Sequence, residues 1–229
     1  MWRTNAGLVD SHTWDSRPPS WPTLRRGINF WGRENRQIYL IGNPVIWWSS
    51  SVAIALYLTF KVLAVLRWQR GYADYALTNF RRFDFEVGVA VLGWGLHYFP
   101  FYLMRRQLFL HHYFPALYFA IIAFCQLFDF ITARIGVLGL KRKPVFGWTI
   151  ATVFLTLSIA AFSLYAPLAY GGPWTKAQCN RVKLFTTWDW DCNNFHDSVW
   201  SVLSLRETAI RTNPRGVSTP TIRPRLHRG

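Results

Sequence analysis

Residues 145–168 read VFGWTIATVFLTLSIAAFSLYAPL and contain no charged side chain. A helix needs about 20 mostly apolar residues to cross the hydrocarbon core of a bilayer. This stretch is therefore long enough to span a membrane, and it predicts a transmembrane helix.

Three further segments follow the same pattern. Residues 45–66 form an apolar run that Lys61 interrupts near one end, and we expect this side chain to reach toward the lipid headgroups. Residues 85–104 are the weakest candidate because glycines, a histidine and a proline lie inside them, whereas residues 113–132 are strongly apolar. The sequence predicts an all-α integral membrane protein with four spans.

The composition of the whole chain agrees with this fold class. Of its 229 residues, 51% are hydrophobic and only 16% are charged, whereas soluble domains carry roughly a quarter charged residues. The net charge of +15 could indicate nucleic-acid binding, but the basic residues lie between the apolar runs and in the two tails. That placement is typical of topology signals and of contacts with anionic headgroups, so we expect no nucleic-acid partner.

The loops between the apolar runs predict an orientation. Basic residues gather after the first and third runs, where they are Arg67, Arg70, Arg81, Arg82, Arg134, Lys141, Arg142 and Lys143. Cytoplasmic loops carry an excess of Lys and Arg, so these two loops should face the cytoplasm. Both ends of the chain and the turn between the second and third runs should then face the opposite, lumenal compartment.

This orientation divides the chain into four expected parts. They are a lumenal segment at 1–43, the four-span region at 44–168, a second lumenal segment at 169–199, and a basic tail at 200–229. The tail is rich in Pro and Thr and lacks apolar periodicity, which predicts disorder.

The cysteines fit the same arrangement. Cys179 and Cys192 fall in the second lumenal segment, where an oxidising compartment favours a disulfide over two unpaired thiols. Cys125 lies in the third apolar run and is expected to be a small buried hydrophobic residue.

Polar side chains gather between the second and third runs. Residues 93–119, GWGLHYFPFYLMRRQLFLHHYFPALYF, place Arg105, Arg106, His111 and His112 in a turn short enough to lie at the membrane surface. Guanidinium and imidazole groups there suit a phosphate or pyrophosphate. Anchoring at the lipid headgroups is the alternative. A metal site is disfavoured because adjacent histidines point in different directions and no clear third ligand is nearby.

His97 lies inside the second run. A single intramembrane histidine more often makes a hydrogen bond between helices than it takes part in catalysis. Gln126 and Asp129 in the third run have the same interpretation.

These motifs resemble a known family. The sequence HYFPFYLMRRQLFLHHYFPALYF, at 97–119, resembles the signature of the C-terminal membrane region of the dolichyl-phosphate-mannose–protein O-mannosyltransferases. Three other stretches match in the same order, namely SRPPSWPTLRRGINFW at 16–31, QIYLIGNPVIWW at 37–48 and TTWDWDCNNF at 186–195. The resemblance covers nearly the whole chain and is strongest to the fungal-type second subfamily.

The resemblance implies a fold and an activity. It implies the C-terminal helical bundle of a GT-C glycosyltransferase in the endoplasmic reticulum membrane, with a lumenal active site. Such enzymes transfer mannose from dolichyl phosphate mannose, a lipid-linked co-substrate, to Ser or Thr of secretory proteins, and no cofactor is expected. A dimer with a homologous mannosyltransferase is implied as well.

The resemblance also implies roles for residues. The lipid phosphate would be bound by Arg106 with His111 or His112, and the wider candidate set adds Arg105, Gln107 and His97. The catalytic carboxylate and a lumenal β-trefoil domain belong to parts of the family that this chain does not match, so the chain alone is expected to be inactive. The alternatives are a non-catalytic membrane subunit that binds a partner transferase or its lipid donor, and a small transporter.

Overall fold

The computed structural model describes residues 10–33, 35–73, 78–134 and 144–198. The elements in chain order are η1 (Pro18–Ser20), β1 (Ile28–Arg33), β2 (Arg36–Leu40), α2 (Pro44–Gln69), α3 (Thr78–Tyr98), α4 (Pro100–Leu103), η3 (Leu110–Tyr113), α5 (Phe114–Arg134), α6 (Pro144–Tyr170), α7 (Lys176–Val182) and η5 (Cys192–Asn194). The tail expected at 200–229 lies outside the described residues.

Helix α2 begins where its sequence signals predict. The Asn43 side chain accepts hydrogen bonds from the backbone N–H groups of Val45 and Ile46, at 3.1 and 3.4 Å, and Pro44 occupies the first helical position. A capping amide and a proline are both favourable there because the first N–H groups of a helix lack partners within it. Asn43 also donates to the carbonyl of Ser158, 2.8 Å away, and so joins the start of α2 to α6.

Three of the described helices are long and apolar enough to cross a membrane, namely Pro44–Gln69, Leu110–Thr132 and Gly147–Tyr170. The expected second span corresponds to α3 and α4. The composition of α3 is not apolar enough for it to count as a membrane span by the same measure. Glycines and a histidine reduce the mean hydropathy of α3. Its first turns also carry four charged residues, namely Arg81, Arg82, Asp84 and Glu86, and the two arginines were expected to lie in a loop. A helix of 21 residues still measures about 31 Å, the thickness of a bilayer core.

Lys61 and Asp84 form an ion pair between α2 and α3. The Lys61 Nζ lies 2.5 Å from Asp84 Oδ2, and the Tyr57 hydroxyl donates to the other carboxylate oxygen at 2.9 Å. Lys61 was expected only to reach toward the headgroups, but it has a partner on the neighbouring helix. Pairing offsets the cost of a charge at this depth.

Small residues allow the helices to approach closely. Ala116, Ala120 and Ala123 lie on one face of α5 and are fully buried. On α3, a Cβ added at Gly93 would lie 2.6 Å from the Phe119 ring, so only glycine fits against α5 there. Such residues are common where membrane helices pack. Cys125, expected to be buried, is exposed on α5.

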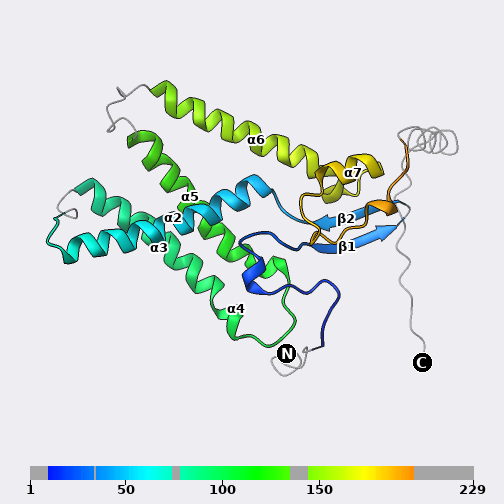
Figure 1. The fold of residues 1–229 in the computed structure, drawn as a ribbon, viewed down its shortest axis with the longest axis horizontal. Coiled ribbons are helices and arrows are strands. Elements are labelled where there is room, and N and C mark those ends of the chain that lie inside the picture. The colour runs from blue at the N-terminus through cyan, green and yellow to red at the C-terminus, as the bar shows by residue number, and fades with distance from the viewer. Residues whose placement is uncertain (1–9, 34, 74–77, 135–143, 199–229) are drawn as a thin grey trace, which may run out of the picture.

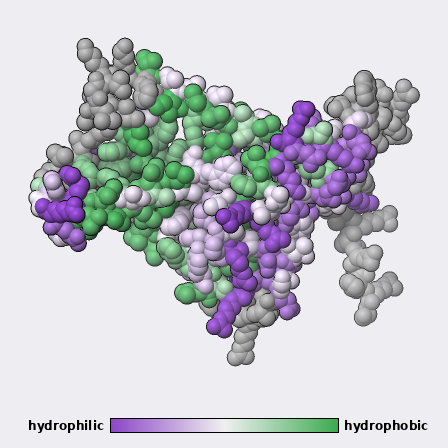
Figure 2. All heavy atoms as spheres, viewed as in Figure 1, coloured by the Kyte–Doolittle hydropathy of each residue, from purple (hydrophilic) through white to green (hydrophobic). Residues whose placement is uncertain are grey.

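The two ends of the bundle differ. Figure 1 shows the end of α2 and the start of α3 on the same side as the end of α5 and the start of α6, opposite the hairpin and α7. Figure 2 shows hydrophobic residues over the helices and hydrophilic residues around the hairpin and α7. The helical membrane bundle is confirmed.

The all-α prediction did not include a β-hairpin. Strands β1 and β2 pair antiparallel with Ile28 opposite Leu40 and Arg33 opposite Arg36, and an irregularity lies between Asn29 and Trp31. Strands this short, with one of them irregular, leave a weak alternation in the sequence.

The hairpin is joined to the bundle by hydrogen bonds to the carbonyls that precede it. Indole N–H groups of Trp47 and Trp188 donate to the carbonyls of Trp21 and Leu24, each at 2.7 Å. The Ser51 hydroxyl donates to the Pro22 carbonyl at 2.7 Å. These contacts bring the N-terminal and C-terminal segments together over the start of α2.

Candidate functional site: a polar cluster between α4 and α5

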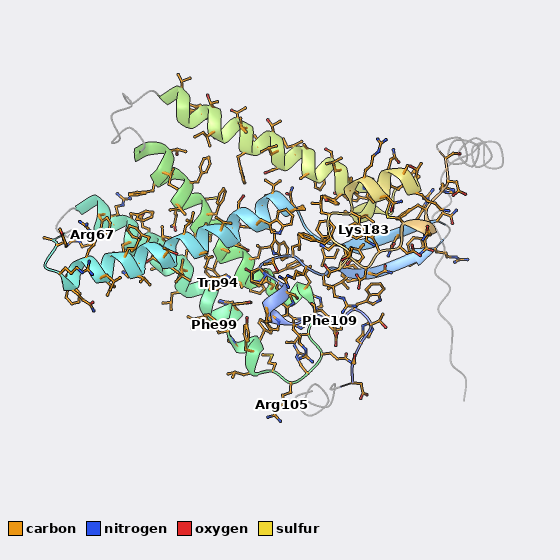
Figure 3. All side chains as sticks on the ribbon, in the orientation of Figure 1. Arg67, Trp94, Phe99, Arg105, Phe109 and Lys183 are labelled. Carbon is orange, nitrogen blue, oxygen red and sulfur yellow. A yellow bond between two sulfur atoms is a disulfide. The ribbon has the colours of Figure 1, made fainter. Side chains whose placement is uncertain are left out.

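The loop between α4 and α5 starts because the helix cannot continue regularly. Phe99 still has helical dihedral angles, but Pro100 has no backbone N–H to continue the hydrogen bonds of α3, and it starts the short helix α4, after which Met104 is extended. At Phe109 the chain is again extended, with φ −136° and ψ 159°. Because side chains alternate along an extended backbone, Leu108 and Leu110 both point into the core. Figure 3 shows this loop, with Arg105 and Phe109 labelled.

Arg106 and His112 form the centre of the site. The Arg106 Nη2 lies 3.2 Å from His112 Nε2. A guanidinium can only donate, so His112 Nε2 is the acceptor in this contact. On the other side of the ring, His112 Nδ1 lies 3.0 Å from the backbone nitrogen of Phe109 and 3.1 Å from its carbonyl oxygen. Arg106 and His112 therefore keep fixed orientations.

Aromatic rings surround this pair. The rings of His111 and His112 stack with centroids 4.4 Å apart, and the Phe109 ring lies nearly parallel to the His111 ring at 5.7 Å. His12, from a distant part of the chain, packs edge-on against Phe109 at 5.4 Å. We call Arg105, Arg106, Gln107, His111 and His112 the polar cluster, and His12 borders it.

The remaining predicted residues occupy different positions. Arg105 is exposed and points away from the ribbon at the edge of the molecule (Figure 3). Gln107 donates to the Asp10 carbonyl, so its amide binds the chain rather than open solvent. His97 contacts the Gly93 carbonyl at 2.8 Å and the Phe119 ring, neither of which belongs to the polar cluster. The structure thus brings Arg106, His111 and His112 into contact, whereas Arg105 and Gln107 only share their loop and His97 lies on α3.

An N-terminal segment covers the loop. Residues 10–17, which we call the strap, run beside it, and the Ser16 N–H donates to the Leu108 carbonyl at 2.8 Å. The sequence analysis did not single out His12 or the strap. A signal was present, since the family-like stretch 16–31 begins inside the strap.

A second polar group holds the strap from its other side. Arg26 donates from Nε to Asp189 Oδ2 at 2.9 Å and from its two Nη atoms to the carbonyls of Asp15 and Thr13, at 3.0 and 2.6 Å. The Tyr39 hydroxyl donates to Asp189 Oδ1 at 2.5 Å. Burial, and next the hydrogen bond to the Asp189 carboxylate, raise the pKa of Tyr39 far above its ordinary value.

Cys179 and Cys192 form a disulfide in the structure, with their Cα atoms 5.6 Å apart. Both side chains are buried, next to a segment in which Trp188 and Trp190 have no exposed surface. The disulfide therefore closes the segment that carries Asp189. In the part of the chain that the structure describes, no three His, Cys, Asp or Glu residues are placed to hold a metal ion.

An apolar cavity of about 290 Å³ lies elsewhere, between β2, the start of α2 and the end of α6. Its lining includes Ile38, Leu40, Phe162 and Ala166, and no residue of the polar cluster. This cavity is therefore apolar and separate from the polar cluster.

The polar cluster has the chemistry of an anion site. Arg106 and Arg105 provide permanent positive charges, and the two imidazoles add hydrogen-bonding groups. Charge-assisted hydrogen bonds to phosphate are about twice as strong as neutral ones. These groups can donate such hydrogen bonds to a phosphate.

Comparison with known families identifies similar sequences over nearly the whole chain. A family profile described as the C-terminal four TMM region of protein-O-mannosyltransferase matches residues 1–188. Dolichyl-phosphate-mannose–protein mannosyltransferase 1 of Candida albicans is 43% identical over 201 residues, which is 87% of this chain and 23% of that protein. The protein of the same name from Saccharomyces cerevisiae is 34% identical over 96% of this chain and 26% of its own length.

A solved structure is similar as well. The S. cerevisiae protein O-mannosyltransferase Pmt1-Pmt2 complex bound to the sugar donor matches with a TM-score of 0.83 and 34% identity, over 89% of this chain and 27% of the other. The chain spans about a quarter of the length of these relatives. Within C. albicans, mannosyltransferase 1 is 43% identical to this chain and mannosyltransferase 2 is 34% identical. These identities therefore add no support for the resemblance to the second subfamily.

Proposed function

Because this chain belongs to the protein O-mannosyltransferase family, we propose that it forms the C-terminal membrane region of an enzyme that transfers mannose from dolichyl phosphate mannose to Ser or Thr of secretory proteins. The chain is a multi-pass membrane protein with the helical bundle of a GT-C glycosyltransferase. The polar cluster binds the phosphate of the lipid donor in this proposal.

One observation carries the proposal. Arg106 and His112 hold each other in place at the loop between two membrane helices, where a lipid-linked phosphate would lie. An arginine at that boundary on the lumenal side opposes the usual distribution of charge, so an anionic ligand would offset its cost.

The reaction assigns this cluster a defined role. The acceptor hydroxyl oxygen forms a bond to the anomeric carbon of mannose, while the bond from that carbon to the phosphate oxygen breaks. The hydroxyl proton goes to a carboxylate that we place outside this chain, and the electron pair of the broken bond goes to the dolichyl phosphate. Arg106 with His111 or His112 would stabilise the charge that develops on this leaving group.

The proposal includes a location and a partner. We place the protein in the endoplasmic reticulum membrane, with residues 1–43, residues 169–199 and the polar cluster in the lumen. The structure similar to this chain is a complex of two such proteins, and a homologous mannosyltransferase is the partner that this similarity supports.

Equilibrium binding tests the proposal. The chain in lipid nanodiscs should bind dolichyl phosphate more tightly than dolichol, which has the same chain and no phosphate. Arg106→Ala should raise the Kd for dolichyl phosphate by about 10- to 150-fold, the value of one charge-assisted hydrogen bond. Arg25→Gln removes an exposed arginine outside the cluster and should leave this Kd unchanged. Equal affinity for the phosphate and the alcohol would refute the proposal.

A further inference from the structure

Arg26 lies between two parts of the chain that are distant in sequence. Its partner Asp189 is 163 residues away, and its other two acceptors are main-chain carbonyls of the strap. All three nitrogen atoms of the guanidinium thus donate. A lysine ammonium could not reproduce three bonds in this planar arrangement.

The strap alternates between Arg26 and the loop. Thr13 and Asp15 face Arg26 through their carbonyls. Asp10, His12 and Ser16 face the loop, where they contact Gln107, Phe109 and Leu108. The strap is therefore held between Arg26 on one side and the backbone of the polar cluster on the other.

Asp189 gives Arg26 a fixed anchor. Its two carboxylate oxygens are occupied by Arg26 and by the Tyr39 hydroxyl, and Tyr39 in turn accepts from the Gly27 N–H at 2.9 Å. The flanking indoles of Trp188 and Trp190 are fully buried. Because Asp189 is held in place in this way, it fixes the position of Arg26 and, through Arg26, that of the strap.

We propose that Arg26 is a positioning residue, which acts with Asp189 through the strap to hold the polar cluster in its phosphate-binding geometry. This inference rests on the proposed function. Arg26 does not touch the ligand. It sets the place of Gln107 and Leu108, which lie in the chain between Arg106 and His112.

The neighbouring residue provides a matched control. Arg25 has the same charge and is exposed, and its backbone N–H donates to the Ser20 carbonyl. Removing its side chain changes the net charge as Arg26→Gln does, so a general electrostatic effect would be equal in both variants.

The experiment measures the Kd of the full chain in nanodiscs for dolichyl phosphate and for dolichol. Arg26→Gln should raise the Kd for dolichyl phosphate by about 2- to 30-fold, the range found for residues that act through others, and leave the Kd for dolichol unchanged. Arg26→Lys keeps the charge and should lie between Arg26→Gln and the wild type. Hydrogen exchange at the Ser16 amide should be faster in both variants, because its bond to Leu108 is loosened.

A double-mutant cycle tests the coupling to Asp189. If the two residues act as one device, Asp189→Asn should raise the same Kd, and the double variant should add little to either single change. Additive effects of the two changes would overturn the coupling to Asp189.

The outcomes separate this inference from the proposed function. If Arg106→Ala raises the Kd for dolichyl phosphate while Arg26→Gln behaves like Arg25→Gln, the positioning role is wrong and the proposed function stands. If the wild type does not prefer the phosphate, both are wrong. A role only in stability would lower the unfolding temperature of Arg26→Gln without changing the Kd of the folded protein.

Discussion

At the scale of single residues, Arg106 combines a charge with a fixed direction. Its Nη2 lies 3.2 Å from His112 Nε2, so that the guanidinium and the imidazole hold each other in place. Headgroup anchoring would need the charge alone, whereas bidentate phosphate binding needs the planar guanidinium. The two interpretations therefore differ in how a lysine should behave.

Arg106→Lys tests this difference. We expect mannosyl transfer by the enzyme that contains this region to fall by about 10-fold or more, because lysine keeps the charge and loses the bidentate geometry. Transfer from dolichyl phosphate mannose to a Ser/Thr peptide is measured with matched amounts of folded protein. Near-normal turnover with lysine would make Arg106 a membrane anchor.

Tyr39 is the residue on which the anchor of Arg26 depends. Tyr39→Phe removes the hydroxyl that donates to Asp189 and accepts from Gly27, and leaves both groups in a partly buried site. We expect the free energy of unfolding to fall by about 1–3 kcal/mol, the cost of unsatisfied buried polar groups. Denaturant unfolding measures it, and an unchanged midpoint would show that solvent satisfies these groups.

At the scale of elements, the close contact between α3 and α5 depends on residues with no side chain or a very small one. The Phe119 ring lies against Gly93, where a Cβ would be 2.6 Å from it, and the buried alanines of α5 continue the same contact. Helices in a membrane gain little from the hydrophobic effect between them, so close packing stabilises their association.

Gly93→Ala should therefore destabilise the bundle by about 1–3 kcal/mol, the usual cost of overpacking. Gly95→Ala is the matched control, since its Cβ would lie 3.4 Å from the Phe99 ring in the same helix. Thermal unfolding in detergent should distinguish the two variants. Equal unfolding temperatures would mean that the Phe119 ring moves aside without cost.

At the scale of the whole molecule, the hydrophilic structure lies at one end of the bundle. The hairpin, α7 and the strap gather there, and the end of α2 and the start of α3, on either side of the basic turn, lie at the other end (Figure 1). The charge of that turn predicts that it faces the cytoplasm.

Site-directed labelling tests this orientation in intact microsomes. In a Cys125→Ala background, Tyr72→Cys should react with a membrane-impermeant maleimide, and Arg36→Cys should react only after permeabilisation. Both positions are exposed, so accessibility to solvent is matched. Reaction of Arg36→Cys before permeabilisation would reverse the proposed topology.

The sequence alone was sufficient for the helical membrane fold, because hydropathy and charge act locally along the chain. The apolar runs predicted α2, α5 and α6 to within a few residues, and the family-like motifs identified the region that the profile matches. The weak hydropathy of the second run was visible as well, and α3 remains the least apolar of the four long helices.

Only the tertiary structure decided which distant residues meet. His97 stands close to the signature histidines in sequence, yet it faces Gly93 and Phe119 because α3 is a continuous helix there. His12 was not considered, yet it packs on Phe109 because Arg26 and Asp189 hold the strap. Contacts across 163 residues depend on the packing of many segments at once, and no local pattern in the sequence encodes them.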